Sequence, residues 1–406
     1  MPSTSSERTA GMVCYFDADT YPGVYNASNL LVERGWHVDV VCFDQYGFKG
    51  ERFDPRVRIH RIRPGMRSGP LGGLRFYQEF VRNVRKVSQA NRWNWAFGHD
   101  LCGFTACRLA RVLPARRVVF WSQDLAEPRR LTFDKRCLYH LKRHLLRTCP
   151  LAIATSTSRA AVMRGTLPLS RAPVVVYNSP RRDLPTFERG IWRSRLAIDD
   201  KHILGVYAGG IGRNRFVPEL VQSVRDWPRD ASLVIAGYGS PEVIDEIRAA
   251  ASTAPLQGRV HLLEHLPHPF ELLNDSDFGV SLFALDPNHR NLAHRGIASN
   301  KIFENLAFGN PVVATGNAET SDFFRRWGCG VCVENHTPAG IAAAVRSLLE
   351  DRASLKQRSD AARHTHLHET YFEKRFHVIL EVLETGDLEQ QCRPPLSTAT
   401  TESSST

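Results

Sequence analysis

Apolar and polar residues alternate along this chain in short blocks whose period changes in a regular order. Short apolar runs, typical of buried strands, are separated by stretches in which apolar residues recur every three or four positions, as on one helix face. The run over 56–63 instead alternates polar and apolar residues, with one break at His60 and Arg61, as a half-exposed edge strand does. In the first half, the pattern predicts helices over 26–34 and 74–89 and further strands at 11–16, 37–43, 95–98, 117–121, 151–155 and 173–177.

The rhythm stops at residues 180–201, which are rich in turn formers and charge, and then starts again. Strand–helix alternation on both sides of this break implies parallel sheets with helices on both faces. An amphipathic helix over 369–384 ends the pattern. The strands expected in the second half are 203–209, 232–237, 260–263, 278–283, 311–315 and 330–334.

We therefore expect an α/β protein of two doubly wound, Rossmann-like domains. The pattern places the first domain at 11–185, the second at 200–365 and a C-terminal helix within 366–386. Residues 1–10 and 387–406 are polar, rich in Ser and Thr, and without periodicity, so we expect both ends to be disordered.

Composition narrows the functional classes. A chain of 406 residues that is 42% hydrophobic can bury the cores of two or three domains, which excludes a wholly disordered protein. Its 53 Lys and Arg against 42 Asp and Glu leave a formal charge of +11, which favours an anionic partner: a phosphorylated ligand, an acidic membrane surface or nucleic acid. Nine scattered cysteines suit reduced thiols. No apolar run approaches the ~20 residues of a membrane helix, and the polar N-terminus has no secretory signal, so a cytoplasmic protein is expected.

The basic residues are concentrated in the first half. Ten Lys and Arg stand against one acid between residues 56 and 92, and seven against one between 129 and 147, with aromatic and apolar residues interleaved. Such stretches suit an anionic membrane interface, although solvated helix faces give the same pattern. Peripheral contact with the inner face of a membrane therefore stays open. Nucleic acid is not expected as a partner, because the chain has no helix-turn-helix, RNP or zinc module.

The most informative segment is 299–315, SNKIFENLAFGNPVVAT, a short helix that leads into a buried strand. Lys301 and Glu304 are three residues apart and share a face near the helix N-terminus. The free N–H groups and positive dipole at that end can hold an anion, and a carboxylate one turn in can accept hydrogen bonds from a ribose diol. An ordinary surface Lys–Glu pair would look the same.

This segment resembles the P-x-K-φ-x-E-Y-φ-A-x-G-x-P-V-φ-A pattern (φ apolar) of GT-B glycosyltransferases, especially the GT4-like group (family 4, or group 1). The resemblance implies that Glu304 binds the ribose of a nucleotide sugar and that Lys301 lies near its diphosphate or sugar. Two positions depart from the pattern. Many members carry a second Glu where this chain has Gly296, and Asn305 replaces the usual Tyr.

Residues 207–222, YAGGIGRNRFVPELVQ, resemble the opening strand, glycine turn and helix of the GT-B donor domain. The resemblance implies that Gly209 and Gly210 approach the nucleotide closely and that Arg213 and Arg215 neutralise the leaving diphosphate. A glycine-rich turn with solvated arginines is the alternative.

Residues 233–240, LVIAGYGS, resemble the strand end that follows in the family. Gly237 and Gly239 would line the cleft there. The loop over 262–266 would then hold the nucleobase through backbone groups, with Leu266 at its end.

In the first half, the strand ends FGHD (97–100) and FWSQD (120–124) carry polar residues. In a doubly wound sheet such ends face the ligand crevice, so His99, Asp100 and Asp124 are candidate active-site groups. A structural His or a helix-capping Asp would give the same pattern for each.

Two D-x-D patterns, 17–19 and 275–277, invite comparison with the metal site of GT-A transferases. One ends the first strand and the other precedes a strand, which is not where GT-A enzymes place theirs. No metal site is therefore expected, although Asp17 or Asp19 can line the acceptor cleft.

Together these resemblances imply transfer of a sugar from a nucleotide-diphosphate sugar to a hydroxyl of a glycan or lipid-linked acceptor, with retention of configuration. No metal or other cofactor is expected, because the arginines, Lys301 and the helix terminus would stabilise the leaving group. An inverting enzyme would need a base, and His99 or Asp100 could serve. The family architecture also allows the C-terminal helix to cross back to the first domain. A non-hydrolysing nucleotide-sugar epimerase of the same architecture and a basic membrane- or nucleic-acid-binding protein stay open as alternatives.

Overall fold

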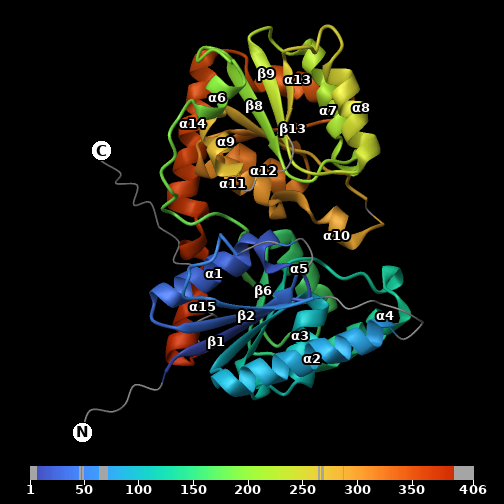
Figure 1. The fold of residues 1–406 in the computed structure, drawn as a ribbon, viewed down its shortest axis with the longest axis vertical. Coiled ribbons are helices and arrows are strands. Elements are labelled where there is room, and N and C mark those ends of the chain that lie inside the picture. The colour runs from blue at the N-terminus through green and yellow to red at the C-terminus, as the bar shows by residue number, and fades with distance from the viewer. Residues whose placement is uncertain are drawn as a thin grey trace, which may run out of the picture.

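The chain forms two parallel sheets, one above the other, each flanked by helices (Figure 1). This confirms the α/β class and the pair of Rossmann-like domains facing across a cleft. The computed structural model describes residues 7–44, 47, 50–63, 72–263, 266, 269–286 and 288–387.

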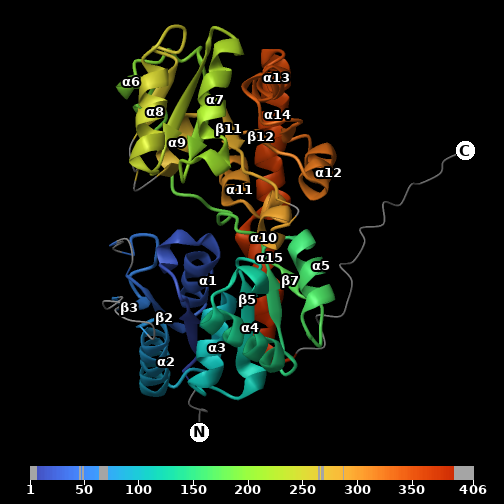
Figure 2. The same ribbon diagram turned by 90° about the vertical axis from the view of Figure 1, so that its right-hand side faces the viewer.

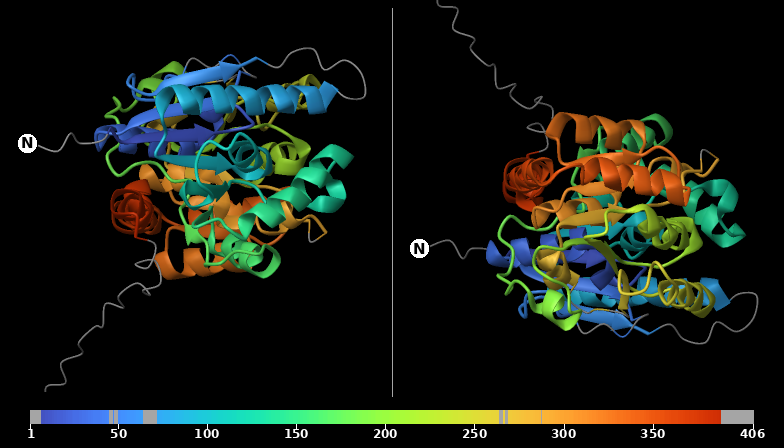
Figure 3. Two further views of the ribbon diagram at one scale, coloured as in Figure 1. Left: turned by 90° about the horizontal axis from the view of Figure 1, so that it is seen from below. Right: turned by 90° about the horizontal axis from the view of Figure 1, so that it is seen from above.

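The first sheet has the strand order β3-β2-β1-β4-β5-β6-β7, so its direction of winding reverses between β1 and β4. Helices α1 and α15 cover one face, and α2, α3, α4 and α5 cover the other (Figure 3). The strands are β1 (Thr9–Val13), β2 (His37–Phe43), β3 (Arg58–Ile62), β4 (Trp95–His99), β5 (Val118–Ser122), β6 (Ala152–Ala154) and β7 (Val174–Val175). The helices are α1 (Pro22–Glu33), α2 (Gly72–Asn91), α3 (Asp100–Leu109), α4 (Phe133–Leu146) and α5 (Thr157–Thr166).

The second sheet has the order β10-β9-β8-β11-β12-β13 and reverses between β8 and β11. One face packs on α7, α8 and α13, and the other on α9 and α11. The strands are β8 (Ile203–Ala208), β9 (Ala231–Ala236), β10 (Val260–Leu263), β11 (Phe278–Ser281), β12 (Val312–Thr315) and β13 (Gly330–Val333). The helices are α6 (Ile191–Arg195), α7 (Val217–Ser223), α8 (Pro241–Ala251), α9 (Pro269–Asp275), α10 (Arg290–Ala293), α11 (Asn300–Ala307), α12 (Ala318–Trp327), α13 (Pro338–Leu348) and α14 (Arg352–Thr365).

The C-terminal helix crosses back to the first domain. Helix α14 belongs to the second domain, and a π-helical turn (His366–Thr370) leads from it to α15 (Phe372–Thr385), which lies against the first sheet (Figure 2). Phe376 of α15 is fully buried and stacks on Trp121 of β5, with ring centroids 5.8 Å apart. Its apolar face therefore completes the first core, which ties the two domains together through the chain end.

The ends of the chain differ in part from expectation. Strand β1 begins at Thr9, so residues 9 and 10 are ordered, where the sequence pattern placed a disordered segment. The Thr9 N–H donates to Asn94 Oδ1 (2.7 Å) and Ala10 is fully buried, which is why the strand reaches past the apolar run. Residues 1–6 and 388–406 of the two tails expected to be disordered lie outside the described residues.

The alternating segment 56–63 forms β3, and its position at the sheet edge confirms the prediction. Its basic residues are held by buried acids. Arg58 Nη2 and His60 Nε2 lie 3.1 and 2.8 Å from the carboxylate of Asp39 on β2, which also accepts from Trp93 Nε1 (2.8 Å). Arg58 and His60 on one face of the strand therefore pair with a buried carboxylate, and Arg61 on the other face pairs with the buried Asp17 and Asp19.

Candidate functional site

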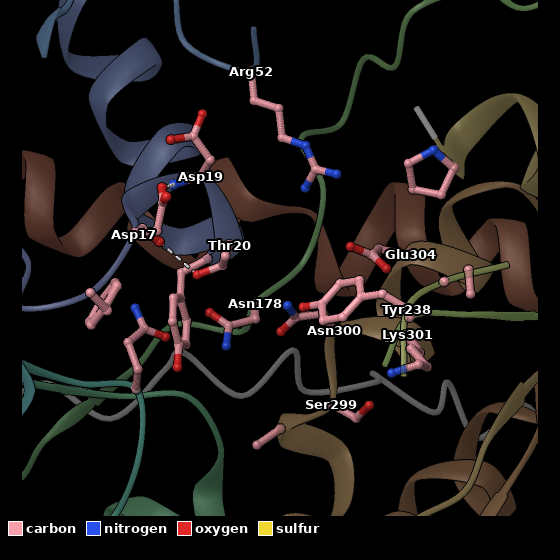
Figure 4. A pocket seen from close by; sticks show the side chains of 18 of the residues that line it. Asp17, Asp19, Thr20, Arg52, Asn178, Tyr238, Ser299, Asn300, Lys301 and Glu304 are labelled. Carbon is pink, nitrogen blue, oxygen red and sulfur yellow. Dashed lines mark hydrogen bonds between the residues drawn. The ribbon is translucent and has the colours of Figure 1, made fainter. Parts of the chain in front are cut away.

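A cavity of about 500 Å³ lies between the two domains, at the carboxyl ends of strands from both sheets. This is the crevice where doubly wound sheets bind ligands. Figure 4 shows Asp17, Asp19 and Thr20 on the first-domain side of it and Lys301 and Glu304 on the second-domain side.

Lys301 is the central cation of the second-domain wall. It lies in the first turn of α11, and its Nζ sits 5.3 Å from the ring centroid of Tyr207. Gly209, at φ +135, makes room for it, because a Cβ there would lie 2.7 Å from the Lys301 Nζ. Burial and the nearby charge of Arg215 lower the pKa of Lys301 to about 7. The free site therefore holds a lysine whose charge an anionic ligand would restore.

Glu304 lies one helical turn beyond Lys301 and also lines the cavity. Burial raises its pKa, while the charges of Arg52 and Lys301 act in the opposite direction. Arg52 comes from the first domain, rests 5.5 Å from the ring centroid of Tyr25, and extends toward Glu304 across the cleft (Figure 4). The carboxylate therefore faces cations from both domains.

Two further arginines complete this wall. Arg215, in the short helix after β8, lines the cavity, whereas Arg213 points away and pairs with Glu246 (2.6 Å). Arg295 lines the cavity too, and burial together with Arg215 lowers its pKa to about 10. The cluster of Lys301, Arg215 and Arg295 is suited to a diphosphate.

Gly296 stands where many GT4-like sequences carry a Glu. A Cβ at this glycine would lie 2.2 Å from Asn317 Nδ2, and Asn317 is fixed because its Oδ1 accepts from the Thr320 N–H (2.9 Å). A side chain has no room at this position, and the neighbouring Arg295 occupies the cleft instead.

The glycines of the second domain separate into two groups. Gly237 lines the cavity and approaches Gly209 so closely that a Cβ would lie 1.9 Å from its carbonyl oxygen. Gly210 and Gly239 are not among the lining residues: the carbonyl of Gly210 accepts from Tyr207 Oη (2.6 Å), and Gly239 bridges Ile211. Leu266 and the exposed ring of Tyr238 lie at the edge of the cavity, next to Gly237.

Of the three polar candidates at strand ends of the first domain, Asp124 lines the cavity. Its Oδ1 accepts from Asn291 Nδ2 (2.9 Å) and Arg159 Nη2 (3.3 Å). Asp100 does not line the cavity: its Oδ1 accepts the N–H groups of Gln123 (2.7 Å) and Asp124 (3.0 Å). Burial, and then the charge of Asp124, raise the pKa of Asp100 to about 7. Asp100 holds the strand end in place rather than facing a ligand.

His99 lies beneath the wall and does not line the cavity. It is fully buried and stacks on Trp121 with centroids 5.1 Å apart. Burial lowers its pKa to about 3, so the ring is neutral at physiological pH. Its position does not allow direct contact with a ligand in the cavity.

The first D-x-D pattern lies in the cavity wall. Arg61 of β3 pairs with Asp17 Oδ1 (3.2 Å) and Asp19 Oδ2 (2.6 Å), and both acids line the cavity. Their carboxylates are thus held by an arginine within the first domain.

The second D-x-D pattern is structural. Asp275 accepts the backbone N–H groups of Gly190 and Trp192 (2.6 Å each) at the start of α6, and Asp277 accepts from the buried Arg193 (2.6 Å). Over the part of the chain that the structure describes, no cluster of three or more His, Cys, Asp or Glu could hold a metal ion.

Arg159, at the start of α5, joins the two domains beside the cavity. Its guanidinium donates to the Gln123 carbonyl and Asp124 in the first domain, and to Asn291 Oδ1 (2.8 Å) and the His294 carbonyl (3.2 Å) in the second. Ser158 Oγ lies 2.5 Å from His294 Nδ1 in the same contact. The segment around α10 therefore docks directly on the wall that carries Asp124.

Sequence reasoning did not single out Arg52, Arg295, Arg159, Gln123 or Tyr238. Arg52 lies between two elements without a motif, and only the tertiary structure brings it to Glu304. Gln123 and Tyr238 lie inside the segments 120–124 and 233–240, next to the candidates Asp124, Gly237 and Gly239. Both residues lie just after the end of a strand, and this position could have identified them as residues of the ligand crevice.

Two family models match the chain. One described as "Glycosyl transferases group 1" matches residues 206–351, and one described as "Glycosyl transferase 4-like domain" matches residues 22–179. No curated protein matches the sequence.

Solved structures share the whole fold at low identity. Alr3699/HepE of Anabaena, in complex with UDP and glucose, aligns at a TM-score of 0.71 and 15% identity over 93% of this chain and 100% of its own. Sucrose-phosphate synthase of Thermosynechococcus elongatus aligns at 0.73 and 15% over 94% and 99%. A putative UDP-N-acetylglucosamine 2-epimerase of Listeria monocytogenes aligns at 0.62 and 12% over 94% and 97%.

Proposed function

Because the chain belongs to the group 1, 4-like glycosyltransferases, we propose that its interdomain cavity transfers a sugar from a nucleotide-diphosphate sugar to a hydroxyl of a glycan or lipid-linked acceptor. Family membership selects glycosyl transfer over the nucleotide-sugar epimerase and the basic binding protein. The observation that carries the proposal is that Arg215 and Arg295 lie near Lys301 and line one cavity together with it and Glu304.

In this proposal Glu304 accepts hydrogen bonds from the ribose, and Lys301 and Arg215 bind the diphosphate. The acceptor hydroxyl oxygen attacks the anomeric carbon, and the bond from that carbon to the diphosphate oxygen breaks. Lys301, Arg215 and Arg295 stabilise the negative charge that develops on the diphosphate, which is the role a metal ion would otherwise fill. We propose on this basis that transfer needs no metal.

The first-domain acids support transfer with retention. Asp17 and Asp19 are paired with Arg61, and Asp124 with Arg159, so these three carboxylates are already engaged by arginines of the protein. His99 and Asp100, the bases that inversion would need, do not line the cavity. We propose that the acceptor proton passes to the departing diphosphate oxygen, on the face where the acceptor enters.

Incubation with radiolabelled UDP-, GDP- and dTDP-sugars in the presence of EDTA tests the proposal. One donor class is expected to raise the thermal stability, by about 2.7 kcal/mol at 100 times its Kd, and to be hydrolysed or transferred. NMR of the product then shows whether the anomeric configuration is kept. Absence of nucleotide binding and turnover with every donor would refute the proposal, and activity lost to EDTA would refute its metal independence.

The pH dependence of donor affinity is a separate prediction. The pKa of Lys301 is lowered to about 7 in the free site, so above this pH the free protein holds it largely neutral. A bound diphosphate raises the pKa again, so binding takes up a proton, and affinity falls as pH rises from about 7 toward the ordinary lysine range near 10.4. Calorimetry with the bound nucleotide sugar at pH 8, in two buffers of different ionisation enthalpy, measures the uptake. The Lys301→Met variant is expected to show none, whereas equal uptake in both proteins would contradict the assignment.

We also propose that the first domain touches an anionic membrane through one corner, here called the basic tip: Leu74, Arg75, Arg129, Phe133, Lys135 and Arg136. The starts of α2 and α4 meet there, since a Cβ on Gly73 would lie 3.8 Å from Asp134 Oδ2. Phe133 is 81% exposed and Leu74 45%. Exposed apolar side chains among cations suit a lipid headgroup region. Lys142, counted with this stretch in the sequence, is instead buried against Phe120 and Tyr139.

Within the described residues, none of the helices is long and apolar enough to cross a membrane.

Cosedimentation with lipid vesicles tests the basic tip. Vesicles of phosphatidylcholine and phosphatidylglycerol are expected to bind the protein, and added salt or pure phosphatidylcholine to weaken binding. Phe133→Ser should lower vesicle affinity about tenfold, because this is the change in affinity that corresponds to the free energy of partly burying one aromatic side chain. Leu109→Ser is the matched control, because Leu109, the last residue of α3, is 45% exposed and follows Arg108, which donates to Thr148 just beyond the end of α4. Equal binding by the wild-type protein and Phe133→Ser would exclude this surface.

A further inference from the structure

The first-domain wall of the cavity holds two amide side chains with buried polar atoms that have no hydrogen-bond partner among the described residues. Gln123 is 1% exposed and Asn178 is 3% exposed, and both line the cavity. Neither Nε2 nor Oε1 of Gln123, nor Oδ1 of Asn178, has a partner among the described residues. Both side chains are more than nine-tenths buried, and they lie at the wall of the cavity.

Gly23, near the start of α1, brings the two amides together. A Cβ on this glycine would lie 3.2 Å from Gln123 Nε2 and 3.3 Å from Asn178 Oδ1. Both amides therefore border the same small volume, over the Trp121 ring, whose Cζ2 would lie 2.9 Å from that Cβ. The glycine leaves open a volume that any other residue would occupy.

The backbone around Gln123 is fixed from two sides. Its N–H donates to Asp100 Oδ1 (2.7 Å), and its carbonyl accepts from the buried Arg159. Next to Asn178, the Ser179 carbonyl accepts from Asn26 Nδ2 (2.9 Å). The amides are thus held in place by bonds that do not use their own polar atoms.

Such atoms carry a cost unless something binds them. A buried polar group without a partner costs about 1–3 kcal/mol, and native proteins keep few of them. A site built to hydrogen-bond a ligand shows this pattern while the ligand is absent.

We infer that Gln123 and Asn178 form a subsite for the hydroxyl groups of an uncharged sugar ring. The inference rests on the proposed function and adds the kind of ligand group that the first-domain wall takes. A side-chain amide offers both N–H donors and an acceptor oxygen, and a sugar hydroxyl donates and accepts, so two amides can bind two hydroxyls. The neighbouring acids Asp17 and Asp19 share one cation, Arg61, so this part of the wall does not favour an anionic ligand. The ring is either the sugar being transferred or the acceptor sugar.

Isosteric apolar variants test the subsite. Gln123→Met and Asn178→Leu keep the side-chain volume and remove the amide atoms, and Gln78→Met, at an exposed position of α2, is the matched control. Without ligand, both variants should unfold at the wild-type temperature or above, because they remove unpartnered buried atoms. A lower unfolding temperature would mean that the amides are structural and would overturn the inference.

Binding then identifies the ring. Calorimetry compares UDP with UDP-glucose and GDP with GDP-mannose, and saturation-transfer NMR follows free glucose, mannose, galactose and N-acetylglucosamine over the nucleotide-saturated protein. If the ring is the transferred sugar, the variants bind the nucleotide as the wild type does and lose about tenfold in affinity for the nucleotide sugar. If it is the acceptor, donor affinities are unchanged and the free-sugar signal is lost.

Wild-type behaviour of both variants in every arm would overturn the inference while nucleotide binding still supported the proposed function. Failure of the wild-type protein to bind any nucleotide would instead refute the proposed function itself. The two failures are therefore distinguishable in one set of measurements.

Discussion

A Glu304→Gln variant is expected to lose about 30- to 140-fold in kcat/KM for its nucleotide-sugar donor. A hydrogen bond to a charged group contributes about 1–1.5 kcal/mol more than one to a neutral group, and a ribose diol offers two of them to one carboxylate. Losing the charge from both bonds therefore costs about 2–3 kcal/mol, and 1.4 kcal/mol corresponds to a factor of ten. The change also removes the negative charge that Lys301 and Arg52 face across the cleft.

Steady-state kinetics and nucleotide calorimetry measure this loss. Glu350→Gln, at an exposed position of the same domain, is the matched control and should keep full activity. Because burial raises the pKa of Glu304, the neutral glutamine is expected to leave the unfolding temperature unchanged or to raise it. If the Glu304→Gln variant showed wild-type kinetics with the donor, Glu304 would not be part of the donor site.

An Arg159→Met variant is expected to lose about 2–4 kcal/mol of unfolding free energy and to weaken the contact between the domains. Arg159 is 4% exposed, and its removal leaves the Gln123 and His294 carbonyls and the Asn291 amide short of a donor. Methionine fills much of the volume, so the loss measures the hydrogen bonds rather than a cavity.

Urea denaturation measures the stability, and small-angle scattering with and without nucleotide follows the separation of the domains. Arg164→Met, exposed on the same helix, is the control and should change neither. Asn291→Ala removes partners of Arg159 and Asp124 from the second-domain side and should loosen the domains at a smaller cost in stability. Unchanged stability and scattering in Arg159→Met would mean that these bonds do not hold the closed arrangement.

Much of the fold could be predicted because its signals are local. Strand β2 and the edge strand β3 follow directly from runs of apolar and alternating residues, and α11 places Lys301 and Glu304 on one face because they are three residues apart. The sequence pattern alone did not show whether α15 crosses to the first domain. An amphipathic pattern shows which face of a helix is buried, but not which element it packs against.

The candidate site residues also separate into those that local sequence patterns placed correctly and those that they did not. Asp124, Arg215, Lys301 and Glu304 lie in the cavity because strand ends and a helix start are local features that open parallel sheets direct to one edge. His99 is also near a strand end, yet its side chain points under the wall, because alternate residues of a strand face opposite sides of the sheet. The neighbouring Asp100 is drawn to the N–H groups of the next strand end.

The sequence by itself determined the order of strands and helices, the family, and the Lys301–Glu304 pair, because each depends on neighbours within a few residues. Only the tertiary structure decided that Arg52 faces Glu304, that Arg61 holds Asp17 and Asp19, and that Gln123 and Asn178 border one volume over Gly23. These contacts join segments from different strands and both domains. They depend on a strand order that reverses within each sheet and on how the domains dock, and neither leaves a local pattern in the chain.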